Sequence, residues 1–148
     1  MARNEKSVEI KAPPEKVWEL LALDRWSEWD VGHFVDTKNM KFTSEVNTPE
    51  DKYRVGASAH VVEKRWEYDL DVTESLEKEK ITVRSKGKYV YTFTYVLKPV
   101  DGGTRLDWVG DFEMPWGILG KALWGIYGRT ADRDVERAFG KLKGVLEK

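Results

Sequence analysis

The side chains in this sequence best suited to chemistry are tyrosine hydroxyls and one histidine. Tyr91 and Tyr95 share the parity of one alternating segment, so both hydroxyls could polarise the carbonyl of a ligand. His60 would add an acid, a base or a hydrogen-bond anchor if it pointed the same way, but its segment leaves both directions open. His33 is the only other histidine, and two isolated histidines make a poor metal site. We therefore predict no metal and no cofactor.

These tyrosines belong to a larger set of aromatic residues that alternate with polar residues. A period of two places alternate side chains on one face of a strand. The expected inner face carries Trp66, Tyr68, Tyr91, Phe93, Tyr95, Trp108 and Phe112. Charged residues such as Asp107 and Asp111 have the opposite parity and are expected in water. Rings of this size do not interdigitate fully, so the inner face is expected to leave a pocket.

The elements that must position these rings follow from the hydrophobic periodicity. Turn signals and period-two patterns predict strands at residues 7–11, 34–46, 56–63, 66–76, 81–85, 89–97 and 106–114. Consecutive hairpins form a meander, which gives an antiparallel sheet with one wet face. Between the first two strands, Pro14 is expected to open one short helix and Asp24 to cap a second. Trp26 and Trp29 in the second helix are better suited to sealing the core than to gating an entrance.

The last quarter of the chain is predicted to form one long helix with two different halves. Residues 116–127 are apolar, whereas residues 132–148 are amphipathic and suited to lying on a surface. The apolar half is too short to span a bilayer, so we predict no integral membrane segment. The sheet must instead wrap around it, which would bring three of its side chains to the aromatic face: Leu119, Leu123 and Tyr127.

Composition excludes several classes of protein. The 148 residues suit a single domain, 1–148. With 25 basic and 26 acidic residues, no overall field favours nucleic acid or anionic lipid, so we predict no nucleic-acid partner. The absence of cysteine excludes disulfides and thiol chemistry, and the first residues lack the apolar core of a signal peptide. A cytoplasmic location is expected. Abundant charge and the absence of glutamine resemble heat-adapted proteins.

In order and type, these elements resemble the START-like superfamily, also called SRPBCC or Bet v 1-like. The similarity is greatest to its polyketide cyclase/dehydrase and lipid-transport branch. It rests on the sequence from Ala12 to Trp18, on Trp29, Val55-Gly56 and Gly103-Thr104-Arg105-Leu106, and on the closing segment from Asp132 to Phe139. The resemblance implies an α+β helix-grip fold: a seven-stranded antiparallel sheet around a long C-terminal helix, with two short helices between strands 1 and 2. The polar stretch from Thr43 to Tyr53 departs from the family pattern, so the resemblance does not predict where the entrance to the pocket lies.

The favoured function is binding or transport of a hydrophobic small molecule between the sheet and the C-terminal helix. The molecule would be a lipid, an isoprenoid, a quinone or a polyketide-like compound. The family has no universal catalytic residues, so binding without catalysis is favoured. The predicted ligand contacts are the seven inner-face aromatic residues, the three apolar residues of the last helix, and His60.

Two alternatives stay open. The first is a cyclase or dehydratase that uses Tyr91, Tyr95 or His60 for proton transfer. The second is a protein-interaction module like the chaperone-ATPase activators of the same superfamily. If Trp116 and Trp124 were exposed, they would form an apolar patch suited to a partner or to a second copy of the chain as a homodimer.

Overall fold

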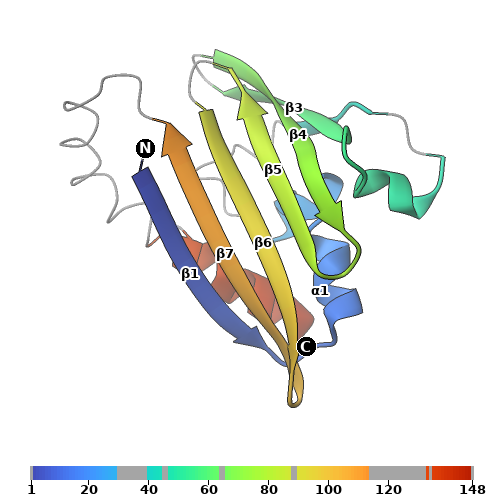
Figure 1. Ribbon diagram of the computed structural model, residues 1–148, viewed down its shortest axis with the longest axis vertical. Coiled ribbons are helices and arrows are strands. Elements are labelled where there is room, and N and C mark those ends of the chain that lie inside the picture. Colours follow the sequence, from blue (N-terminus) through green and yellow to red (C-terminus); the bar gives the residue numbers. More distant parts are fainter. Residues whose placement is uncertain are drawn as a thin grey trace.

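A single curved sheet organises the described part of the molecule (Figure 1). The computed structural model describes residues 2–29, 40–44, 47–63, 66–87, 90–113, 133 and 135–147. Within them seven strands pair antiparallel in the order β1-β7-β6-β5-β4-β3-β2. The strands are β1 (Ala2–Ile10), β2 (Met40–Phe42), β3 (Ser58–Glu63), β4 (Trp66–Leu76), β5 (Lys80–Lys86), β6 (Val90–Val100) and β7 (Gly103–Glu113). The predicted α+β helix-grip architecture is confirmed.

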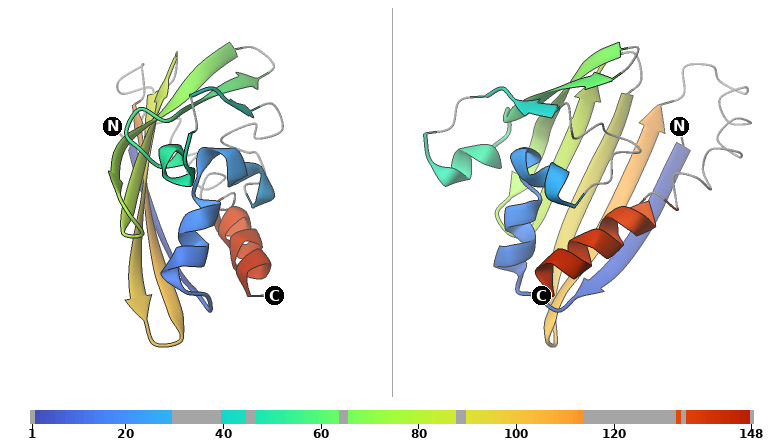
Figure 2. Two further views of the ribbon diagram at one scale, coloured as in Figure 1. Left: turned by 90° about the vertical axis from the view of Figure 1, so that its right-hand side faces the viewer. Right: turned by 180° about the vertical axis from the view of Figure 1, so that it is seen from behind.

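The described helices all lie on one side of the sheet (Figure 2). They are α1 (Pro14–Leu20), the 3-10 helices η1 (Leu23–Glu28) and η3 (Pro49–Lys52), and a C-terminal helix over residues 135–146. Pro14 begins α1 as predicted. A residue at the first helical position makes no hydrogen bond within the helix through its N–H, so proline loses nothing there. The apolar half of the predicted long helix, residues 116–127, lies outside the described residues.

Two details of the predicted elements are wrong. Helix η1 begins at Leu23 with Ala22 in the N-cap position, so Asp24 lies inside the helix and does not cap it. The N-cap therefore lies two positions earlier than predicted, and the first helical residue, Leu23, is fully buried. Strand β6 does not end before Pro99 but continues through it. Strand β5 begins at Lys80, opposite Val96, so no residue of β5 pairs with Pro99 or needs its missing N–H.

One half of the inner face is closed by aromatic packing. Trp26 of η1 and Trp29, which directly follows η1, are almost fully buried, and their indole N–H groups donate to the carbonyls of Leu21 and Leu20. Both rings pack edge-on against Tyr95, with centroid distances of 6.0 and 6.2 Å. The two tryptophans therefore seal this part of the core, as predicted.

The C-terminal helix docks onto the same cluster through Phe139. Its ring lies 6.3 Å from that of Trp29 and 6.2 Å from that of Trp108, which rises from β7. At the edge of the sheet, Lys6 on β1 forms an ion pair of 2.7 Å with Glu136 on the helix. The helix is thus fixed across the strands by a buried ring and by a charged contact at its edge.

Candidate functional site

The rings predicted on the inner face lie together there. Tyr68, Tyr91, Phe93, Tyr95, Trp108 and Phe112 are each at most 9% exposed. Neighbouring rings contact one another across three strands: Tyr91 stacks on Phe93 at 4.5 Å, and Phe93 lies 5.3 Å from Trp108. Phe93 also lies 5.8 Å from Phe112. The alternation along β4, β6 and β7 therefore produces one continuous aromatic surface.

This surface has two ends with different surroundings. Tyr95 and Trp108 pack against η1 and the C-terminal helix, and each is 3% exposed. Tyr68, Tyr91 and Phe112 lie where β4 and β6 begin and β7 ends, and they are 7%, 8% and 9% exposed. We call these three residues the open-end group.

The open-end group contains a pair of hydroxyls. The hydroxyl of Tyr91 donates to that of Tyr68 over 3.1 Å, and the two rings meet edge-on at 6.0 Å. The backbone N–H of Tyr91 donates to the Ser85 hydroxyl at 2.8 Å, which fixes the start of β6 against β5. The sheet thus presents two linked hydroxyls within an otherwise apolar surface. Such a pair can orient an oxygen atom of a bound molecule.

His60 does not join this surface. Its neighbours Ala59 and Val61 are buried on the inner side, whereas His60 points to the opposite face of the sheet. There its Nδ1 lies 2.8 Å from a carboxylate oxygen of Asp69, and its Nε2 lies 3.1 Å from one of Glu67. The hydrogen bond with Asp69, and to a smaller extent the one with Glu67, raises the pKa of His60 above its ordinary value. Its inclusion among the ligand contacts of the inner face is therefore corrected by the strand parity.

Four other predicted contacts fall on side chains that the structure does not describe. Leu119, Leu123 and Tyr127 lie outside the described residues, as does the side chain of Trp66 on the first residue of β4. Among the residues that are described, no group of three or more histidine or carboxylate side chains is arranged to hold a metal ion. None of the described helices is both long enough and apolar enough to cross a bilayer.

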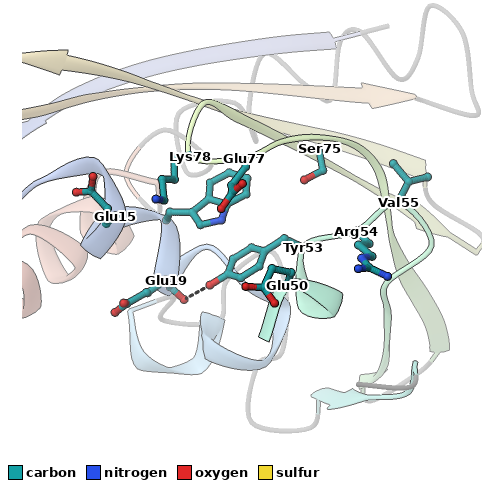
Figure 3. Close-up of a pocket in the computed structure, with 10 residues that line it drawn as sticks. Glu15, Glu19, Glu50, Tyr53, Arg54, Val55, Ser75, Glu77 and Lys78 are labelled. Carbon is teal, nitrogen blue, oxygen red and sulfur yellow. Dashed lines mark hydrogen bonds between the residues drawn. The ribbon is translucent and has the colours of Figure 1, made fainter. Parts of the chain in front are cut away.

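A pocket of about 590 Å³ lies away from this surface, between α1, the segment around η3 and the turn from β4 to β5 (Figure 3). Its walls include Trp18 on α1 and Tyr53 just after η3, whose rings stack at 4.9 Å and 18°. The sequence analysis missed this pocket. One signal was available, since Glu15, Trp18 and Glu19 have helical spacing and share one side of α1.

The fold defines the class of protein: a helix-grip domain with an aromatic inner face. The chain belongs to the polyketide cyclase/dehydrase and lipid-transport family, whose model matches residues 1–147. The resemblance found in the sequence is thereby confirmed. No curated protein sequence matches the chain.

Solved structures share the fold at low sequence identity. The solution structure of a Bacillus halodurans protein is 17% identical with a TM-score of 0.72, and the match covers 99% of this chain and 97% of that one. The Aha1 dimer from Colwellia psychrerythraea is 16% identical with a TM-score of 0.67, over 99% and 97%. DynU16, of the dynemicin biosynthetic locus, is 18% identical with a TM-score of 0.61, over 99% of this chain and 47% of that one. At these identities the likeness shows the fold alone.

Proposed function

We propose that the protein binds and carries a hydrophobic small molecule between the inner face of the sheet and the C-terminal helix. The molecule would be a lipid, an isoprenoid, a quinone or a polyketide-like compound. The observation that carries this proposal is the open-end group, where Tyr68, Tyr91 and Phe112 form an aromatic surface with a pair of linked hydroxyls. Membership of a family described by polyketide cyclase/dehydrase activity and lipid transport supports the same class of ligand.

The magnitudes explain why the hydroxyl pair matters. An apolar ligand that buries about 400 Å² gains roughly 10 kcal/mol, whereas association costs roughly 4–15 kcal/mol. Apolar contact alone would therefore give weak and unselective binding. Hydrogen bonds between an oxygen of the ligand and the hydroxyls of Tyr68 and Tyr91 supply the selectivity. We therefore expect a ligand with an apolar body and at least one carbonyl or hydroxyl oxygen.

Direct analysis of the purified protein tests the proposal. Native mass spectrometry and organic extraction are expected to reveal an apolar compound that accompanies the folded protein and is lost on denaturation. The fluorescent probe N-phenyl-1-naphthylamine is expected to bind with a saturable increase in emission and to be displaced by the extracted compound. Protein that carries no such compound and gives no saturable signal with the probe would refute the carrier function.

Two variants locate the binding site within the aromatic surface. Phe112→Trp enlarges a ring at the open end and should weaken probe binding, because it fills the proposed space. Tyr95→Phe is the matched control, since it changes a ring that packs against Trp26 and Trp29. Its effect on the probe should be small. Equal loss of binding in both variants would contradict a site at the open end.

A cyclase or dehydratase is the second candidate, favoured by the hydroxyl pair because a positioned hydroxyl can transfer a proton. It predicts that Tyr91→Phe abolishes turnover of a polyketide-like substrate while its affinity stays nearly unchanged. If the protein is a carrier, neither the natural protein nor Tyr91→Phe should turn the substrate over, and Tyr91→Phe should bind it more weakly.

We also propose that the protein forms a homodimer, which is supported by the dimeric state of the Colwellia psychrerythraea neighbour. Light scattering coupled to gel filtration measures the mass in solution. A mass of twice 17.2 kDa is expected, and a mass that stays at 17.2 kDa over a wide range of concentration would exclude the dimer.

A further inference from the structure

The pocket beside α1 is built by three separate parts of the fold. Glu15 and Glu19 come from α1, Glu50 from η3, and Glu77 from the turn between β4 and β5 (Figure 3). Its volume of about 590 Å³ is within the range of roughly 300–1,000 Å³ that is usual for small-molecule sites. Elements distant in sequence therefore line an open pocket of the size a small molecule needs.

The walls of this pocket are aromatic and contain an unused donor. Trp18 is only 5% exposed and stacks on Tyr53, whose hydroxyl donates to the backbone carbonyl of Glu19 at 3.4 Å. The indole N–H of Trp18 has no acceptor among the described residues, and it is not sealed from solvent. Trp18 is one of the residues that line the pocket. A donor that no described residue satisfies is available to the acceptor oxygen of a ligand.

The charges around the pocket are unbalanced. The carboxylates of Glu15, Glu19, Glu50 and Glu77 have no hydrogen-bond or ion-pair partner among the described residues. By contrast, many carboxylates on the outer face of the sheet are paired, including Asp71, Asp107, Asp111 and Glu113. The pocket also contains Arg54 and Lys78. With four carboxylates and two cations, the pocket has a net negative charge.

Arg54 does not offset this excess fully, because it is held by another acid. Its guanidinium lies 3.0 Å from Asp51. Asp51 also accepts the backbone N–H groups of Thr48 at 2.9 Å and Asn47 at 2.8 Å, which complete a capping box at the start of η3. These backbone hydrogen bonds hold the pKa of Asp51 below its ordinary value. The wall that carries Glu50 and Tyr53 is therefore fixed before any ligand arrives.

The pocket is distinct from the aromatic surface of the proposed carrier site. Ser75, which lines the pocket, and Tyr68 of the open-end group lie on the same strand, β4. The two residues are seven positions apart, which corresponds to roughly 20 Å along a strand. A small cation in the pocket therefore does not reach the hydroxyl pair.

From these observations we propose that the pocket beside α1 binds a small organic cation that carries an acceptor oxygen. Its ammonium group lies among the carboxylates and against the stacked rings of Trp18 and Tyr53, where a cation is stabilised both by charge and by the aromatic faces. Its oxygen accepts the indole N–H of Trp18. The site is independent of the hydrophobic carrier function.

The test uses choline, which has a quaternary ammonium group and a hydroxyl oxygen. Two-dimensional ¹H–¹⁵N NMR of the full chain follows the indole N–H resonance of Trp18 and the backbone amides of residues 50–55. A Trp18→Phe variant assigns the indole resonance. Choline should shift these resonances saturably, and added salt should weaken the effect. The uncharged isostere 3,3-dimethylbutan-1-ol should bind at least about fivefold more weakly, since it lacks the charge.

Matched variants separate this site from general attraction to an acidic surface. The double variant Glu19→Gln/Glu50→Gln keeps shape and removes two charges, so choline should bind roughly fivefold or more weakly. Glu9→Gln/Glu79→Gln removes two exposed charges on β1 and at the end of the β4–β5 turn, and it should leave choline binding unchanged. The proposal is overturned if choline causes no saturable shift of the Trp18 indole resonance, if the isostere binds equally well, or if both double variants lose binding equally.

Discussion

His60 is held between two carboxylates on the outer face of β3 and β4. Asp69 and Glu67 contact its two ring nitrogens at 2.8 and 3.1 Å, and Lys41 on β2 lies opposite it in register. The hydrogen bond with Asp69, followed by that with Glu67, raises the pKa of His60 above 6.5. A raised pKa in the folded state means that the protonated ring is stabilised by folding. This contribution is fully present below the unfolded pKa and is lost as the pH rises through the folded pKa.

An NMR titration of the His60 ring checks this assignment. We expect a pKa above 6.5 in the natural sequence and a lower value in Asp69→Asn, because the amide no longer carries the charge that favours protonation. Glu113→Gln is the control, since Glu113 lies on the same outer face but pairs with Arg84. An unchanged titration in Asp69→Asn would show that the contact does not form in solution.

The C-terminal helix shows how an element can be well packed on one side and poorly optimised on the other. Phe139 and Leu142 are buried against the sheet. At Gly140 and Gly144, an added methyl group would meet no atom of the described residues within 4 Å. Glycine inside a helix costs roughly 0.5–1 kcal/mol relative to alanine, because it loses more backbone entropy on folding.

Gly140→Ala and Gly144→Ala should therefore each raise the free energy of unfolding by about 0.5–1 kcal/mol. Urea denaturation followed by circular dichroism measures the change. A loss of stability in either variant would mean that another part of the protein, or a second copy, packs closely against this side of the helix.

Gly110 on β7 gives the opposite result for the same substitution. A methyl group there would lie 2.6 Å from two atoms of the Trp108 indole and 3.1 Å from the ring of Phe112. Trp108 is held in place by Phe93 and Phe139, so it cannot move aside freely. Gly110→Ala should lower the free energy of unfolding by about 1–3 kcal/mol in the same denaturation experiment. A neutral result would indicate that the aromatic surface is loosely packed at this point.

At the scale of the whole molecule, one sheet holds two proposed sites at its opposite ends. The hydroxyl pair lies where β4 begins, and the pocket beside α1 lies where β4 ends. Between them, the rings of Trp26, Trp29 and Tyr95 form a packed cluster. Effects at sites this far apart are usually additive, because they share no contacts.

Two ligands and two sets of variants test this independence. N-phenyl-1-naphthylamine and choline should each raise the melting temperature, and their effects should add when both are present. Phe112→Trp should reduce only the response to the naphthylamine, and Glu19→Gln/Glu50→Gln only the response to choline. Crossed effects, in which either change alters both responses by similar amounts, would mean that the two ligands share one site.

The sequence by itself determined the sheet and the side of it that is buried. Strict alternation in residues 90–97 and 104–112 decides which side chains face inward, because successive side chains of a strand point to opposite faces of the sheet. The same rule failed for His60, whose neighbours are small or apolar on both parities and therefore carry no pattern. Its direction was decided by the pairing of β3 with β4.

Only the tertiary structure decided where aromatic rings are packed and where a pocket lies. The periodicity of β6 treats Tyr91 and Tyr95 alike, yet the ring of Tyr95 packs against Trp26 and Trp29 whereas the hydroxyl of Tyr91 donates to Tyr68. That difference depends on the path of a helix distant in sequence. The pocket beside α1 has the same origin, because Trp18, Tyr53 and Glu77 come from three separate elements. Local patterns report the direction of a side chain, whereas a site requires the distances between elements, which only the folded chain defines.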